Sequence, residues 1–355
     1  MHEPIRVTTL AGDPASMGRE HGERHAAAIA EYAAERIGLS VDGSWAGEPM
    51  RTEHALELAA RCLPHHRRYS TELGEEMESL AEAAGISVEA ALIVGGFTDF
   101  IDVVRAHTGR AVFEDTCTAV IVPNQAAADG RGLIGQTWDM HDTAMPHVVL
   151  FRIEPDSGPA ALVFSTVGCL GQIGMNEAGV AVGINNLASV GKVGVTWPFV
   201  VRKALQQHTL DDAVACIVDA DLAGAHNYLV MDRTGVGVDV EAMPGVVHVT
   251  RTEGAPIIHT NHCLAETTMT VEAERPEETM TWSLDRLTYA KERMGAGRGG
   301  VATIQELLKE PEPICAGVPS HKVATCGAAV MRPATLEFWA LWGNPVHNEF
   351  ERFEV

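Results

Sequence analysis

The stretch FEDTCTAVIVPN, residues 113–124, marks the point where the character of the chain changes. Up to residue 110 the sequence is rich in Ala and Glu with helical spacing of apolar residues, as in EHGERHAAAIAEYAAERIG at 20–38 and TELGEEMESLAEAAG at 71–85. From Cys117 on, short Val- and Ile-rich segments are separated by Asn, Asp, Gly and Pro, which predicts strands joined by turns. We therefore expect the main boundary of the chain between Arg110 and Cys117, with Cys117 opening a strand.

The part after Cys117 predicts strands interrupted by helices. A helix is expected in WPFVVRKALQQHTLDDAVACIVDAD at 197–221, where HTLD could break it. Five strands are expected before this helix, in TAVIVP, GLIGQTWDM, HVVLFRIEP, PAALVFSTVG and GVAVGINNL, and four after it, in HNYLVMD, VGVDVEAM, GVVHVTR and PIIHTNH. Two more helices, in TWSLDRLTYAKERMG and TIQELLKE, precede a last strand pair in CGAAVMRPA and LEFWALWG. Strand runs separated by helix runs favour a layered α+β fold with antiparallel sheets over a regular βαβ alternation.

Composition narrows the classes of function. The chain has 355 residues, enough for one large domain or two, and a net charge of −22. Such acidity argues against nucleic acid and against an anionic membrane surface as partners, because both require Lys and Arg. We also expect no membrane span and no secretory signal, since no long apolar run is present. The seven cysteines are scattered and contain no CxxC pair, which favours reduced thiols in the cytoplasm.

Cys117 has two interpretations. It is either a buried strand thiol, since free cysteines are among the most buried residues, or a catalytic group. The second interpretation gains support from an acid, Asp139, at the end of GQTWDM on the next predicted strand, and from an amide, Asn261, in the later segment HTNH. A thiol, a carboxylate and an amide donor are the groups that acyl transfer requires.

The chemistry of this thiol depends on its base. A cysteine at the first position of a mature chain carries its own base, an α-amine with a pKa near 7.7–8.0. Cys117 acquires such an amine only if the chain is cleaved between Thr116 and Cys117. The alternative is a conventional internal thiol that uses His141 or His262 as its base.

The segment HTNHC at 259–263 also allows a metal-binding interpretation. On a strand, however, His259 and His262 point to opposite faces, and the chain has no HExxH motif and no second cluster at zinc spacing. We therefore predict no metal and no organic cofactor.

Taken in order, the motifs are similar to those of a known family. The chain resembles the acyl-coenzyme A:6-aminopenicillanic acid (isopenicillin N) acyltransferase family. Its members are cysteine N-terminal-nucleophile (Ntn) hydrolases and include β-alanyl-amine hydrolases. The resemblance extends over nearly the whole chain and rests on GDPASMGREHG (12–22), LAEAAGISVEAALIVGGFTDF (80–100), CTAVIVPN with GQTWD, IGMNEAGVAVGINNL, AHNYLVMD and, above all, HTNHCL (259–264).

This resemblance implies a fold and a set of roles. The fold is an α+β, four-layer αββα Ntn-hydrolase sandwich with an N-terminal helical segment. Residues 1–116 would be a helical α-chain and residues 117–355 the β-chain, both within one intertwined domain. Cys117 would cleave the chain after Thr116 and then act as the nucleophile. Asp139 would orient the new amine and the thiol, and Asn261 would donate its amide to the oxyanion.

The chain departs from the family pattern at several positions. Relatives usually carry Gly where this chain has Thr116, a bulkier residue that could slow cleavage. They tend to carry an Asn-x-Arg-x-Glu pattern where this chain reads GGFTDF, with Phe97 at the arginine position, and Ala316 replaces another arginine. Two missing cations favour neutral or amine-bearing substrates. We expect Phe97, Trp138 and His141 to line the substrate pocket.

The sequence thus predicts a self-processing amidohydrolase that cleaves a small N-acyl amine or amino-acid amide through an acyl-enzyme on Cys117. Two alternatives stay open: acyl transfer from a thioester such as acyl-CoA to an amine, and an uncut, non-catalytic binding protein of the same fold. The expected partners are a small-molecule amide and, after cleavage, the two chains of an α/β heterodimer that could assemble further. Neither nucleic acid nor a membrane is expected as a partner.

Overall fold

Two β-sheets form the centre of the molecule. The computed structural model describes residues 4–109, 116–295, 298–317 and 322–355. One sheet has the strand order β1 (Val7–Gly12), β4 (Val148–Pro155), β5 (Ala161–Thr166), β6 (Ile173–Asn176), β7 (Ala181–Leu187), β8 (Ala225–Met231), β9 (Gly237–Met243) and β10 (Val246–Arg251). The other has the order β11 (Ile257–His259), β2 (Ala119–Val122), β3 (Leu133–His141), β12 (Val323–Arg332), β13 (Glu337–Trp342) and β14 (Glu351–Glu354).

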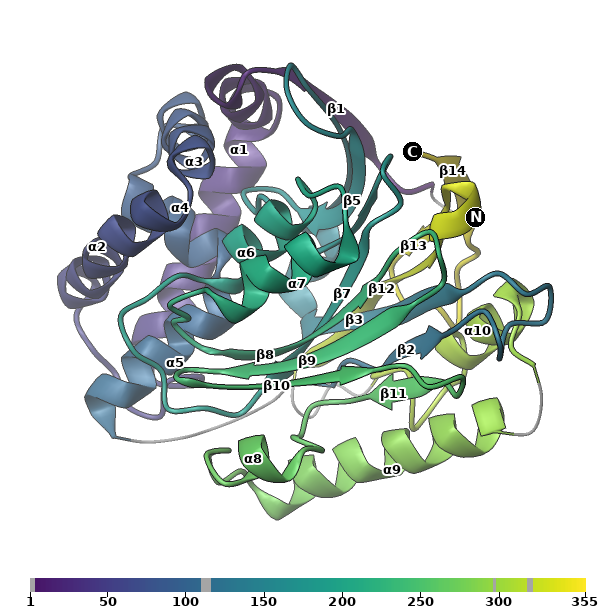
Figure 1. The fold of residues 1–355 in the computed structure, drawn as a ribbon. Helices are drawn as coiled ribbons and strands as arrows, with labels where there is room; N and C mark the ends of the chain where they lie inside the picture. The colour runs from purple at the N-terminus through teal and green to yellow at the C-terminus, as the bar shows by residue number, and fades with distance from the viewer. Residues whose placement is uncertain (1–3, 110–115, 296–297, 318–321) are drawn as a thin grey trace.

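The two sheets pack face to face, with helices on both outer sides (Figure 1). Helices α6 (Trp197–Ala204) and α7 (Leu210–Val218) cover the eight-stranded sheet, where α7 contacts β8 and β9. Helices α9 (Glu277–Gly295) and α10 (Val301–Leu308) cover the six-stranded sheet, and the short helix α8 (Glu266–Met269) lies beside β10. This arrangement confirms the expected four-layer αββα sandwich.

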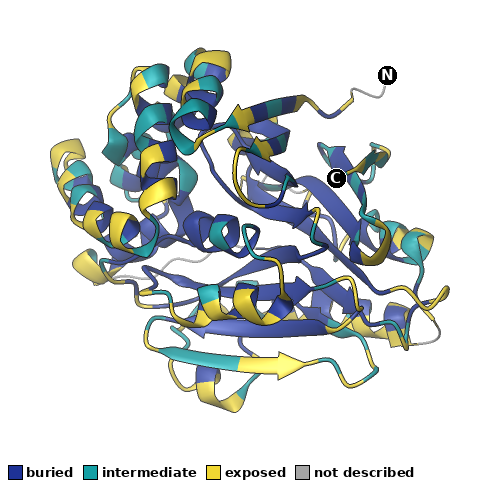
Figure 2. Ribbon diagram, turned by 45° about the horizontal axis from the view of Figure 1, so that its top comes forward, coloured by how far each residue is buried: buried dark blue, intermediate teal, exposed yellow. Residues whose placement is uncertain are grey.

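Burial follows these layers. The central strands are almost wholly buried, whereas the edge strands β10 and β14 and the outer faces of the helices are partly or fully exposed (Figure 2). All nine residues of β3 are buried, because one face of the strand packs on the other sheet and the opposite face lies under α10. Neighbouring strands are antiparallel as predicted, except that β1 runs parallel to β4.

The residues before Cys117 are mainly helical, as predicted. They form α1 (Pro14–Val41), α2 (Thr52–Tyr69), α3 (Thr71–Ala84), α4 (Val88–Gly95) and α5 (Phe97–Thr108), which gather at one end of the sandwich (Figure 1). Ser87 caps α4 by accepting a hydrogen bond from the backbone N–H of Ala90. The prediction missed β1, a six-residue strand that joins the N-terminal segment to the edge of the larger sheet.

Other sequence expectations can be placed directly. The helix expected at 197–221 does break, because Thr209 caps a second helix by accepting from the N–H of Asp212. The predicted boundary between Arg110 and Cys117 falls on residues 110–115, which lie outside the described residues. Among the helices that the structure describes, none is both long and apolar enough to cross a membrane.

Candidate active site

Cys117 lies two residues before β2, where the chain enters the six-stranded sheet. The backbone N–H of Thr137 on β3 donates to the carbonyl of Thr118 at 3.0 Å, so pairing extends past the end of the strand. The Cys117 side chain is buried, with the Asp139 N–H donating to its Sγ at 3.4 Å. Strand alternation places Cys117 on the same side as Gln136, whose side chain bonds Ile184 in the other sheet. The thiol therefore faces the space between the sheets.

Asp139 lies beside both residues of the predicted cleavage site. The Thr116 hydroxyl donates to its Oδ2 at 2.6 Å. Burial raises the pKa of the Asp139 carboxyl to about 6, although the Thr116 hydroxyl and the positive charge of Arg286 both lower it. The carboxylate is therefore mostly ionised at neutral pH, but it can be protonated within the physiological range.

Asn261 is connected to Cys117 through an arginine that the sequence analysis did not single out. Arg286 on α9 is fully buried, and its Nη1 donates to the Cys117 carbonyl and to Thr118 Oγ1. Its Nη2 donates to Asn261 Oδ1 at 2.9 Å, while Asn261 Nδ2 donates to the carbonyl of Asn186 at 3.0 Å. The structure thus brings Cys117, Asp139 and Asn261 together around one guanidinium.

Arg286 carried a signal in the sequence that was not used. It shares a face of α9 with Ser283, Leu287, Ala290 and Met294, the spacing of a core-facing stripe. A charged residue within such a stripe is either paired or functional, because an isolated buried charge is costly.

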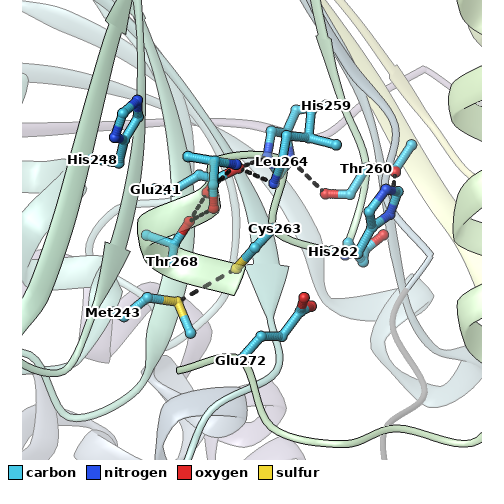
Figure 3. Close-up of polar contacts among 12 residues, drawn as sticks. Glu241, Met243, His248, His259, Thr260, His262, Cys263, Leu264, Thr268 and Glu272 are labelled. Atoms are coloured by element: carbon cyan, nitrogen blue, oxygen red, sulfur yellow. Dashed lines mark hydrogen bonds and ion pairs between the residues drawn. The ribbon is translucent and has the colours of Figure 1, made fainter. Parts of the chain in front are cut away.

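The segment that carries Asn261 is fastened to the other sheet through Glu241 on β9 (Figure 3). The carboxylate of Glu241 accepts from His259 Nε2 at 2.9 Å, from the backbone N–H groups of Leu264 and Ala265, and from the Thr268 hydroxyl. Burial opposes ionisation of Glu241, but the hydrogen bond and charge of His259 outweigh it and lower the pKa of Glu241 to about 2. Burial likewise disfavours the charged form of His259, yet Asp239 and Glu241 raise its pKa. The contact is therefore an ion pair that holds both ends of the Asn261 segment.

The two histidines of HTNH make separate contacts, but β11 ends at His259, so His262 lies beyond the strand and not on its opposite face as predicted. His259 contacts Glu241, whereas His262 Nδ1 contacts Ser283 Oγ at 2.8 Å. Asp239, Glu241 and His259 lie close enough together to hold a metal ion, a grouping missed because the two acids lie on a distant strand. Both oxygens of Glu241 already accept hydrogen bonds from protein donors and Glu241 is paired with His259, whereas the buried Oδ1 of Asp239 has no hydrogen-bond partner among the described residues.

The candidate histidine bases are engaged elsewhere. His141 Nδ1 lies 2.8 Å from the Thr143 hydroxyl, and burial lowers its pKa. Burial, with the neighbouring charge of His259, lowers the pKa of His262 to about 4. A histidine with so low a pKa is a weak base near neutral pH, which disfavours the conventional internal-thiol mechanism for His262.

Two of the three predicted pocket residues line one narrow cavity. Phe97 and Trp138 form its walls together with Tyr32, Met140 and Trp197. Among the described residues, His141 does not line this cavity. Its Nδ1 lies 3.8 Å from Oε1 of Glu35 instead. The expected pocket residues are therefore brought together only in part.

Comparisons with known proteins found several that are similar to this chain. The chain is 26% identical over 263 residues to an acyl-coenzyme A:6-aminopenicillanic-acid-acyltransferase, 40 kDa form, from Emericella nidulans, covering 72% of this chain and 69% of that protein. Among solved structures it is similar to penicillin V acylase from Agrobacterium tumefaciens (12% identity, 67% of this chain and 86% of that chain, TM-score 0.46). It is also similar to a mutant conjugated bile acid hydrolase from Clostridium perfringens (11% identity, 67% and 97%, TM-score 0.45). These two likenesses are too distant to bear on function.

A family model described as acyl-coenzyme A:6-aminopenicillanic acid acyl-transferase matches residues 126–346. The matched stretch begins after Cys117 and includes both Asp139 and Asn261. It spans more than half of the sequence, and the chain therefore belongs to the acyl-coenzyme A:6-aminopenicillanic acid acyl-transferase family.

Proposed function

We propose that this protein is a self-processing Ntn amidohydrolase whose nucleophile is Cys117. The observation that carries the proposal is the network in which Asp139 contacts both Thr116 and Cys117, and Arg286 joins Cys117 to Asn261. Thiol, carboxylate and amide come from three separate segments of the chain, and each is buried. A purely structural core gains little from burying three such groups side by side.

The first step of the proposed mechanism is self-cleavage. Cys117 Sγ attacks the carbonyl carbon of Thr116, the peptide nitrogen leaves as the α-amine of Cys117, and a thioester links Thr116 to the sulfur. Water then hydrolyses this thioester and restores the thiol. The hydrogen bond from the Thr116 hydroxyl holds this residue against Asp139 at the start. Once Thr116 has left, the new amine takes its place on the carboxylate.

The second step is turnover of the amide. The α-amine removes the thiol proton, the thiolate attacks the substrate carbonyl, and the amine product leaves with a proton. One N–H of Asn261 Nδ2 bonds the Asn186 carbonyl, so the other N–H can bond the oxyanion. A donor of this kind stabilises the transition state by about 2.7–4 kcal/mol. Water then releases the acyl group from the sulfur.

After cleavage we expect residues 1–116 and 117–355 to stay together as an α/β heterodimer. Strand β1 pairs with β4, and Phe97 from α5 shares a cavity with Trp138 from β3. No metal or organic cofactor takes part in either step. All seven thiols are free of disulfides, which supports a reducing compartment such as the cytoplasm.

A product assay tests this proposal and separates it from its alternatives. The purified protein is incubated with a panel of N-acyl amines and amino-acid amides, with and without a second amine, and compared with Cys117→Ala. We expect release of the free acid by wild type alone. Predominant formation of a new amide, especially from an acyl-CoA donor, would favour transfer. No turnover together with an uncut chain would favour the non-catalytic binding protein.

A further inference from the structure

Arg36 on α1 is a buried charged residue that the proposed mechanism does not use. This side chain is fully buried, yet among the described residues its Nε, Nη1 and Nη2 have no hydrogen-bond partner. A buried donor left unsatisfied costs more when it is charged. Arginine carries five N–H donors, so a guanidinium without a single hydrogen bond calls for a ligand.

The neighbours of Arg36 leave its donors available. Its guanidinium carbon lies 4.6 Å from the ring centre of Tyr32 and 4.7 Å from that of Phe97. Glu35 Oε2 lies 3.1 Å from Nε but outside hydrogen-bond geometry, and its other oxygen accepts from Thr143. Glu35 therefore reduces the net charge without satisfying the donors, and the rings contribute cation–π attraction without accepting N–H bonds along the guanidinium edge.

Arg36 also lies beside the candidate active site. Tyr32 and Phe97, whose rings contact it, line the cavity that also includes Trp138. Trp138 directly precedes Asp139 and, by strand alternation, faces the same side of the sheet as the Cys117 thiol. Cavity, guanidinium and thiol are thus gathered in one region between the N-terminal helices and the sheets.

The thiol of Cys326 supports this placement. Its Sγ lies 3.9 Å from the Met140 carbonyl on β3. Burial raises the pKa of Cys326, the charge of Asp139 adds to the rise, and the charge of Arg36 opposes it. Arg36 and Asp139 therefore both lie within electrostatic reach of the same group.

We propose that Arg36 binds a carboxylate on the substrate, so that the enzyme acts on amides bearing a carboxylate. A planar guanidinium can bond both oxygens of a carboxylate at once. The inference rests on the proposed amidohydrolase function and specifies its substrate class. This inference differs from the expectation of neutral substrates, which rested on Phe97 standing in place of an arginine. The guanidinium of Arg36, from another helix, lies over the ring of Phe97 and provides a cation there.

The test compares matched substrates that differ only in charge. An N-acyl amino acid and its carboxamide place the charge on the amine side, and the monoamide of a dicarboxylic acid and its neutral analogue place it on the acyl side. We expect wild type to favour one carboxylate substrate over its neutral match by about tenfold or more in kcat/KM, because hydrogen bonds between charged groups are stronger than those to a neutral group. Equal use of both members, or preference for the neutral one in both pairs, would overturn the inference.

Variants assign the preference to Arg36. Arg36→Gln should remove the preference by raising KM for the carboxylate substrate more than KM for its neutral match, and Arg36→Lys should restore part of the preference. Arg19→Gln, an exposed position on the same helix, is the matched control and should change neither. A preference that survives in Arg36→Gln would contradict the assignment.

A binding readout separates failure of this inference from failure of the proposed function. The melting temperature of wild type is measured with each substrate pair, and the measurement is repeated with Arg36→Gln. Stabilisation of wild type alone by a carboxylate would support the site even if no amide were cleaved. Cleavage of neutral amides without any carboxylate effect would leave the proposed function intact and refute the site. If Arg36→Gln does not fold, the substrate preference of Arg36→Lys and the wild-type ratios of kcat/KM between matched substrates decide whether Arg36 binds the carboxylate.

Discussion

Replacing Arg286 with Met should strongly impair catalysis, although we assign no direct chemical step to this residue. The Met side chain keeps the apolar stem of the arginine but removes the donors to the Cys117 carbonyl, Thr118 Oγ1 and Asn261 Oδ1. A buried acceptor that loses its partner costs about 1–3 kcal/mol. The protein should therefore melt at a lower temperature, and Asn261 should lose the contact that orients its amide.

The effect on turnover can be estimated from the role proposed for Asn261. Loss of one oxyanion donor reduces kcat by about 100- to 1,000-fold. Arg286→Lys keeps the charge but cannot reach both Cys117 and Asn261 with one ammonium group, so it should fall between Met and wild type. Removal of the positive charge should also raise the pKa of Asp139, because Arg286 now lowers it. The acid limb of the pH–rate profile should then move to higher pH.

The assay is kcat and its pH profile for self-cleaved protein, alongside the melting temperature. Arg293→Met, on the same helix but exposed, is the matched control and should behave as wild type. Suppose that Arg286→Met folds and is cleaved, yet keeps kcat within threefold and an unchanged pH profile. The guanidinium would then have no part in placing Asn261, and the reasoning would be refuted.

Three further predictions concern the same region. Thr116→Val should slow self-cleavage, because it removes the hydroxyl that donates to Asp139, whereas Thr116→Ser keeps a hydroxyl and should be cleaved nearly as fast as wild type. Cleavage is followed by gel densitometry, and equal cleavage rates for Thr116→Val and wild type would contradict this prediction. Self-cleavage of wild type should slow as the pH falls through about 6, the pKa of Asp139, and self-cleavage of Asp139→Asn should be slow at every pH. A wild-type cleavage rate that does not change between pH 5 and 7 would contradict this prediction. Glu241→Gln should cost about 3–5 kcal/mol of stability by breaking a buried pair, with exposed Glu253→Gln as control. Because the pKa of Glu241 is lowered to about 2, its contribution is present above the unfolded pKa near 4.5 and lost as pH falls toward 2, so the two proteins should converge in stability at acid pH.

Much of the fold could be predicted because local signals agree with the final packing. Helices α1, α3 and α4 of the N-terminal segment carry side-chain caps, and central strands such as β2, with the sequence AVIV, are short apolar runs. Strand β1 was missed because six residues at a sheet edge carry too short a pattern to stand out before a long helix. Its place in the sheet depends on β4, which follows more than a hundred residues later.

The site could be predicted only where the residues themselves suggest chemistry. Cys117, Asp139 and Asn261 were found as a thiol, an acid and an amide at strand ends, and their roles stay proposals. Arg36 and Arg286 could not be distinguished from ordinary helix arginines by type. Their significance lies in burial: each occupies the buried face of its helix, and only the packed structure shows what surrounds it.

The central claim is that Cys117 becomes an N-terminal nucleophile. The most direct test is the intact mass of purified wild type under denaturing conditions, beside Cys117→Ala. Self-cleavage should give two fragments from wild type, residues 1–116 and 117–355, and a single 38.0 kDa chain from the variant. A single uncut chain from both proteins would contradict it, because Cys117 would then lack the amine that serves as its base.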